Sequence, residues 1–224
     1  MIIAIDGPAG AGKSSVAQTV ARELGFQLLD TGAIYRTVAL VGRQSGLDWE
    51  DGQALGAMAQ TLEIRFSLEG LVNRVLLSRA GDPERDITHA IRTPQMSQGA
   101  SRVSAHPQVR EALLDLQRRI GQAQPSVVEG RYIGTVVFPK ARIKIFLTAS
   151  PQERARRRHS QMVDKGLDNI PTLDEIAAEI AERDARDSQR AVAPLRPAHD
   201  AVLLDSTSMS QSEVVAQIIR LANE

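Results

Sequence analysis

A glycine-rich turn near the start of the chain constrains the fold more than any other feature. Residues 7–14 read GPAGAGKS, which fits the pattern G-x-x-x-x-G-K-[S/T] in full. The apolar run IIAID comes directly before it, and Val16, Val20 and Leu24 follow at helical spacing up to Gly25. This order of strand, loop and helix predicts backbone amides that surround phosphate oxygens at a helix N-terminus.

The same motif predicts how a nucleoside triphosphate is held. Lys13 is expected to reach the β- and γ-phosphates of ATP, and Ser14 to ligate Mg²⁺. Glu129, at the end of a predicted strand, could hold a Mg²⁺-bound water, although pairing with Arg131 is an equally simple interpretation. The other residues expected to bind ATP are Gly7, Pro8, Ala9, Gly10, Ala11, Gly12 and Ser15.

The motif does not identify the phosphate acceptor, because kinases, GTPases and motor ATPases share it. The sequence has no N-K-x-D tetrapeptide, which disfavours a GTPase. Other parts of the chain must therefore indicate the acceptor.

Further short apolar runs predict the architecture. They alternate with helical segments and have the sequences QLLD (27–30), SVVEG (126–130), IKIFLTA (143–149) and AVLLD (201–205). Together with the first run they predict an α/β fold with a five-stranded parallel sheet covered by helices on both faces. Asp48 is a candidate N-cap for a helix through about Gln60.

The pattern changes after residue 61. LEIRFSL (62–68) and LVNRVLLS (71–78) are β-rich runs separated by Glu69-Gly70, which indicates a hairpin. Helices are expected after Thr93-Pro94 and from Pro107. We interpret this stretch as an insertion into the parallel sheet.

Composition excludes several classes of protein. The 224 residues include 27 basic and 27 acidic side chains, so no net charge favours a nucleic acid polymer or a membrane surface. Aromatic residues make up 3% of the chain, too few for a platform that stacks bases. Cysteine is absent, the four histidines show no ligand spacing, and no apolar stretch approaches about 20 residues. A cytoplasmic protein is expected.

Arginines in the stretch 151–190 suggest a second anion site. Arg154, Arg156, Arg157 and Arg158 precede a helical stripe of Ile176, Ile180, Arg183, Asp187 and Arg190. A solvated helix with an Arg183–Asp187 pair would also fit this spacing. Beside a phosphate loop we favour an arginine-rich lid, because phosphoryl transfer needs cations around the transferred group and the exclusion of water.

Four segments together resemble the bacterial cytidylate kinases: GPAGAGKSS, LDTGAIYR (29–36), EGRYIGTVVFPKA (129–141) and RDARDSQRAVAPL (183–195). The resemblance runs nearly end to end, with the motifs in family order. It implies a P-loop nucleoside monophosphate (NMP) kinase, most simply a monomer, that transfers phosphate from MgATP to CMP or dCMP. The implied parts are a core (1–61, 123–150 and 191–224), an NMP-binding insertion (62–122) and a small lid with the following helix (151–190).

The resemblance also implies which residues bind the acceptor. They are Thr31, Arg36 and Arg131 for the phosphate, Ser101, Arg110 and residue 132 for the cytosine, Arg183 and Asp187 for the sugar, and Arg190 between base and phosphoryl path. The catalytic cations would be Lys13, Arg131, Arg183 and Arg190. Arginine forks suit phosphate and cytosine acceptor atoms, and a carboxylate suits hydroxyl donors. For Ser101 and Arg110, solvated positions on helices are the alternative.

One position departs from the family pattern. Tyr132 stands where the family has an aspartate, and a phenol is bulkier, uncharged and a weaker acceptor. The tyrosine is therefore expected to weaken recognition of the cytosine amino group, whereas phosphate binding is not affected. Two alternatives stay open: a kinase for UMP or another small acceptor, and a nucleotide-binding protein with low turnover.

Overall fold

The computed structural model describes residues 1–69, 72–79, 81–164, 166 and 169–224. Its main sheet has five parallel strands in the order β2-β6-β1-β7-β8. Their bounds are Gln27–Asp30 (β2), Ser126–Gly130 (β6), Ile2–Asp6 (β1), Ile143–Thr148 (β7) and Val202–Asp205 (β8). The predicted five-stranded parallel sheet is confirmed.

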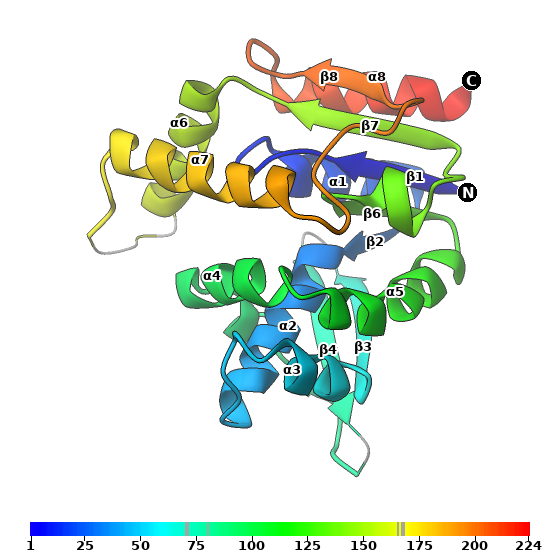
Figure 1. Ribbon diagram of the computed structural model, residues 1–224. Helices are drawn as coiled ribbons and strands as arrows, with labels where there is room; N and C mark the ends of the chain where they lie inside the picture. The colour runs from blue at the N-terminus through cyan, green and yellow to red at the C-terminus, as the bar shows by residue number, and fades with distance from the viewer. Residues whose placement is uncertain (70–71, 80, 165, 167–168) are drawn as a thin grey trace.

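Successive residues of the central strands point into two different cores, which is why both faces must be covered. Ile3 and Val127 pack with α1 (Lys13–Leu24) and α8 (Gln211–Asn223), whereas Ala4 and Val128 pack with α2 (Thr31–Gln44) and α5 (Pro107–Gln122). Figure 1 shows α1 and α8 beside the sheet and α2 and α5 below it. The helix α1 ends at Gly25, whose φ of 66° allows its amide to cap two carbonyls.

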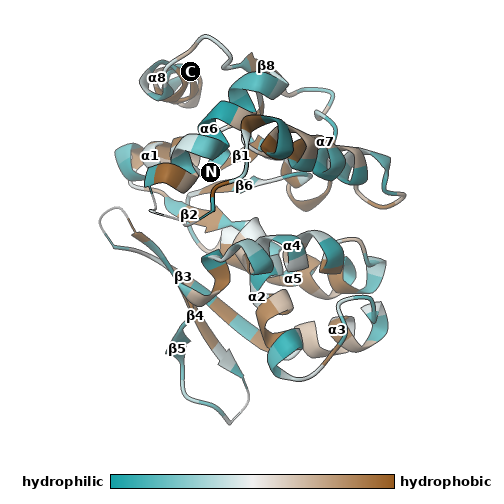
Figure 2. Ribbon diagram, turned by 90° about the vertical axis from the view of Figure 1, so that its left-hand side faces the viewer, coloured by the Kyte–Doolittle hydropathy of each residue, from teal (hydrophilic) through white to brown (hydrophobic). Residues whose placement is uncertain are grey.

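The second part of the chain contains an antiparallel sheet. Its strands are β3 (Leu62–Glu69), β4 (Val72–Arg79) and β5 (Arg85–Asp86), and a short 3₁₀ turn, η1 (Ala90–Arg92), follows. The register pairs Leu62 with Arg79 and Glu69 with Val72, so the predicted hairpin is confirmed, while Gly70 itself lies outside the described residues. Alternate residues such as Ile64 are buried against a layer of helices formed by α2, α3 (Gly52–Ala59), α4 (Pro94–Val103) and α5. Figure 2 shows the antiparallel sheet extending beside α2.

The helices of this second part begin close to the predicted positions. Thr93 caps α4 (Pro94–Val103) by accepting a hydrogen bond from the Met96 amide at 3.2 Å, and α5 begins at Pro107. The prediction for Asp48 was wrong. The helix α3 (Gly52–Ala59) begins at Asp51, whose carboxylate accepts from the Ala54 amide at 2.9 Å, whereas Asp48 accepts from the Glu50 amide within a turn.

Two helices, α6 (Pro151–Asp164) and α7 (Leu173–Gln189), lie side by side next to the phosphate loop (Figure 1). A capping box formed by Thr172 and Glu175 starts α7. Ile176 and Ile180 are buried and Asp187 continues their stripe, as the spacing predicts. None of the helices in the described residues is long and apolar enough to span a membrane. The boundaries between core, insertion and lid stay a prediction.

Candidate active site

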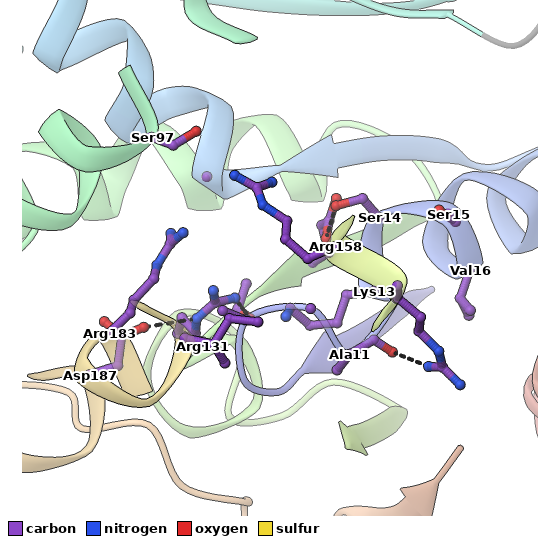
Figure 3. A pocket seen from close by; sticks show the side chains of 18 of the residues that line it. Ala11, Lys13, Ser14, Ser15, Val16, Ser97, Arg131, Arg158, Arg183 and Asp187 are labelled. Carbon is purple, nitrogen blue, oxygen red and sulfur yellow. Dashed lines mark hydrogen bonds and ion pairs between the residues drawn. The ribbon is translucent and has the colours of Figure 1, made fainter. Parts of the chain in front are cut away.

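A cleft of about 610 Å³ is lined by residues of the phosphate loop, the end of β6 and the helices α2, α4, α5, α6 and α7. It brings together residues that are far apart in the sequence, and Figure 3 shows several of them directed toward one space. The predicted site residues that line it are Ala9, Gly10, Ala11, Gly12, Lys13, Ser14, Ser15, Thr31, Arg36, Ser101, Arg110, Glu129, Arg131, Tyr132, Arg183, Asp187 and Arg190. Of the predicted set, Gly7 and Pro8 do not line the cleft.

The phosphate loop joins β1 to α1. Gly7 packs so closely on β7 that a Cβ atom would lie 1.9 Å from the carbonyl oxygen of Leu147, which explains a glycine there. The Lys13 side chain is buried, and its Nζ donates to the carbonyl of Pro8 at 2.6 Å. Burial, followed by the positive charge of Arg131, lowers the pKa of Lys13 well below its ordinary value. An anion in the loop would offset both effects.

A hydroxyl and a carboxylate meet where the nucleotide's metal is expected. Ser14 Oγ donates to Glu129 Oε2 at 2.9 Å, while Arg131 pairs with Asp187 rather than with Glu129. Burial and the neighbouring Asp30 carboxylate raise the pKa of Glu129 to about 7. The described residues contain no group of three or more histidines or acidic residues placed to hold an ion. A hydroxyl beside one carboxylate suits Mg²⁺ bound mainly by nucleotide phosphates and water.

The raised pKa of Glu129 predicts a pH-dependent stability of the free protein. The folded state keeps the proton up to about pH 7, whereas the unfolded chain loses it near 4.5, so this group's stabilising effect disappears as the pH rises through that window. Glu129→Gln cannot ionise and is expected to be more stable than the wild type at pH 8 by up to about 3 kcal/mol, with a smaller difference at pH 5. Denaturant unfolding at both pH values measures this, with Glu23→Gln on the exposed face of α1 as the control. A difference that is the same at both pH values would contradict it.

The residues predicted to hold the acceptor phosphate lie at the ends of β2 and β6. Thr31 Oγ1 donates to the Glu129 carbonyl at 2.7 Å, which links the two strands beside the cleft. Arg36, in the second turn of α2, pairs with Asp30 at 2.6 Å, and its Nε has no hydrogen-bond partner in the part of the chain that the structure describes. The carboxylate of Asp30 also caps α2 by accepting from the Ala33 amide at 3.0 Å.

Asp187 is the carboxylate at the centre of the arginine group. It accepts from Arg131 Nε at 3.0 Å and from Arg190 Nη1 at 3.2 Å, and Figure 3 shows Arg131 and Asp187 joined beside Arg183. Burial by itself would raise the pKa of Asp187. The positive charges of Arg131, Arg183 and Arg190 outweigh this effect and lower the pKa below its ordinary value. Burial, followed by the charge of Arg131, lowers the pKa of Arg183 to about 10. These residues line the cleft and do not form a solvated helix surface.

Several buried donors that face the cleft have no hydrogen-bond partner among the described residues. They are both terminal nitrogens of Arg110, Nη2 of Arg190, Nε of Arg183 and the hydroxyl of Ser101. Arg110 is 6% exposed, and its Nε donates a hydrogen bond to the Ser104 carbonyl at 2.6 Å. This bond fixes the orientation of the guanidinium group. Buried donors without partners are costly, so this set indicates a ligand rich in acceptor atoms.

Tyr132 lies inside this group of arginines. Its hydroxyl makes a close hydrogen bond with the hydroxyl of Tyr35, and its ring is 4.7 Å from the guanidinium carbon of Arg110 and 5.5 Å from that of Arg190. The face of the ring therefore attracts both cations, at the position where the resemblance leads us to expect a carboxylate. Burial and the neighbouring Tyr132 raise the pKa of Tyr35 well above its ordinary value.

Sequence reasoning missed two side chains that line the cleft, Asp30 and Tyr35, and one behind it that supports the segment after β6, Asp6. Asp6 is 4% exposed and accepts from the amides of Ile133 and Gly134, each at 2.8 Å. These bonds fix the segment that follows Arg131 and Tyr132. One signal was available, since Asp6 and Asp30 both end predicted strands of a parallel sheet, at the edge where such folds bind ligands.

Comparison with known proteins agrees with this geometry. The family model described as cytidylate kinase matches residues 3–224. The chain is 50% identical over 220 residues to a cytidylate kinase of Pseudomonas aeruginosa, which covers 98% of this chain and 93% of that protein. It is 48% identical over 219 residues to that of Vibrio vulnificus (98% and 94%) and 45% identical over 224 residues to that of Syntrophotalea carbinolica (100% and 92%). Similarity of this extent covers the parallel sheet, the antiparallel sheet and the helices α6 and α7 alike, and the chain belongs to the cytidylate kinase family.

Proposed function

We propose that this protein transfers the γ-phosphoryl group of ATP to CMP or dCMP, giving CDP or dCDP and ADP. The observation that carries the proposal is that one cleft is lined both by the phosphate loop and by arginine donors that have no partner among the described residues. Membership of the cytidylate kinase family supports the same reaction. We expect a monomeric, cytoplasmic enzyme.

The donor site consists of the loop and the residues around it. The amides of residues 10–15 would surround the phosphates, and Lys13 would leave the Pro8 carbonyl to reach the β- and γ-phosphates. Ser14 and Glu129 would hold Mg²⁺, directly and through water, and the ion would supply positive charge beside the phosphates. No protein nucleophile is required, because positioning and charge stabilisation carry such a reaction.

The acceptor site consists of the arginine group and the helix ends. Thr31, Arg36 and Arg131 would hold the CMP phosphate in line with the donor. Arg110, Ser101 and Tyr132 would surround the base, and Arg183, Asp187 and Arg190 would contact the sugar and the phosphoryl path. Arg131, Arg183 and Arg190 therefore lie where charge develops during transfer, together with Lys13.

An acceptor panel tests the proposal. Purified protein with MgATP and CMP, dCMP, UMP, AMP or GMP, assayed by coupled ADP detection, should turn over CMP and dCMP. Turnover of UMP at a similar kcat/KM would favour the broader acceptor range that Tyr132 leaves open. A nucleotide-binding protein without ADP production on any acceptor would contradict the proposal.

Arg183→Ala and Asp187→Ala are expected to impair use of the acceptor far more than binding of ATP. Each removes a charged group from the acceptor side of the cleft, so kcat/KM for CMP should fall about 10- to 100-fold. Initial rates with each substrate varied separate the two effects. Arg186→Ala is the matched control, because Arg186 lies on the same helix with its side chain exposed and pairs with Glu182 at 3.3 Å. Equal losses for ATP and CMP would show that α7 does not face the acceptor.

A further inference from the structure

The helices α6 and α7 contact the phosphate loop most extensively at Ala9. The Ala9 side chain is buried in a small apolar cluster whose other buried members all come from the lid: Ala155, Met162, Ile176 and Ile180. The neighbouring Gly10 is equally close to α6, because a Cβ atom there would lie 3.0 Å from the Arg154 carbonyl oxygen. The phosphate loop is thus packed into the core of the lid.

Polar contacts join the same two parts. Asp184 of α7 accepts from the Ala9 amide at 3.1 Å with one carboxylate oxygen and from the Arg154 guanidinium with the other. Arg154 is 8% exposed and donates to the carbonyls of Ala9 and Ala149, each at 3.0 Å. Both polar groups of Ala9 are therefore bound by side chains of the lid.

These two side chains do not belong to the ligand-facing set. Neither Asp184 nor Arg154 lines the cleft, whereas Ala9 and the α7 residues Arg183 and Asp187 do. Because α7 is one continuous helix, the position of Asp184 determines where Arg183 and Asp187 lie relative to the loop.

We propose that Asp184 and Arg154 are positioning residues that anchor α7 to the phosphate loop at Ala9 and thereby couple donor binding to the placement of the acceptor-binding arginines. This inference rests on the proposed function. When phosphate binds in the loop, the backbone around Ala9 becomes less mobile. The contacts of Asp184 and Arg154 with Ala9 then restrict the motion of α7 as well. Such coupling is reciprocal, so the donor should tighten CMP binding by the same factor as CMP tightens donor binding.

Hydrogen exchange on the full chain tests the anchor without any acceptor. A non-hydrolysable ATP analogue with Mg²⁺ is expected to slow exchange of the α7 amides of the wild type by about tenfold or more. Asp184→Asn keeps an acceptor oxygen but loses the charge, and in this variant the analogue should leave α7 exchange nearly unchanged while the α1 amides remain protected. Glu182→Gln, on the exposed face of the same helix, should behave as the wild type.

Calorimetry of CMP with and without the analogue provides the second readout. The analogue should tighten CMP binding by about 5- to 150-fold in the wild type and by less than about twofold in Asp184→Asn, with affinity for CMP alone preserved. Arg154→Lys keeps a positive charge near Asp184 but loses the planar guanidinium that contacts both Ala9 and Asp184. This variant is used if Asp184→Asn does not fold, and it is expected to lose part of the α7 protection. Equal α7 protection in the wild type and either variant, or none in the wild type, would overturn the anchor. A wild type that shows the α7 effect but neither binds nor phosphorylates CMP would instead refute the proposed function.

Discussion

Replacing Lys13 with alanine is expected to lower kcat for phosphoryl transfer at least about 100-fold, because no other cation reaches the β- and γ-phosphates from within the loop. The ammonium group is buried and donates to the Pro8 carbonyl in the free protein, so the loop already holds it within reach of the donor. Its loss leaves the charge that develops during transfer uncompensated. Single-turnover rates at saturating MgATP and CMP measure the effect directly.

The fold is expected to survive the same change. Burial and the charge of Arg131 act against the Lys13 ammonium, so removing it also removes an unfavourable buried charge. Thermal unfolding should therefore show a midpoint no lower than that of the wild type. Lys140→Ala is the control, since this lysine is exposed and does not line the cleft. Near-normal turnover by Lys13→Ala would contradict the kinase assignment.

Much of the fold could be predicted because its signals are local. The apolar runs that became β1, β2, β6, β7 and β8 are short and bounded, and Gly25 and Thr93-Pro94 mark helix ends through their own backbone chemistry. The start of α3 could not be fixed in this way. Asp48 and Asp51 are both good N-caps, and packing of the helix in the core decides between them.

In the site, too, residues with local signals could be predicted, whereas contacts that depend on packing could not. The phosphate loop is a contiguous motif, so its residues could be read directly, and the stripe on α7 follows from helical spacing. The burial of Lys13 and the partners of Asp187 depend on β6 and α7 lying together, which spacing along one element does not show. Tyr35 was missed for the same reason, since its contact with Tyr132 joins α2 to the end of β6 across 97 positions of sequence.

The presence of tyrosine at position 132 leads to a specific prediction about discrimination between CMP and UMP. We expect the protein to bind CMP weakly and to discriminate poorly between CMP and UMP, while ATP still binds well. The Tyr132 ring lies against the guanidinium groups of both Arg110 and Arg190, and its hydroxyl is already bonded to Tyr35. A neutral phenol in that position offers little preference for the cytosine amino group over the uracil carbonyl, because both can hydrogen-bond to a hydroxyl.

Tyr132→Asp is then expected to lower the KM for CMP and to raise the CMP to UMP ratio of kcat/KM by about 5- to 150-fold. That range corresponds to about 1 to 3 kcal/mol, the usual contribution of one charge-assisted hydrogen bond. A carboxylate would also satisfy the unpartnered Arg110 and Arg190 nitrogens, which the ring attracts only through its face. Tyr35→Phe, which removes the hydroxyl bonded to Tyr132 and keeps both rings, separates loss of that bond from gain of the carboxylate. The KM for ATP should stay constant throughout. If Tyr132→Asp changes neither the KM for CMP nor the ratio, residue 132 does not contact the base, and the reading of the acceptor site from the family pattern is wrong at this position.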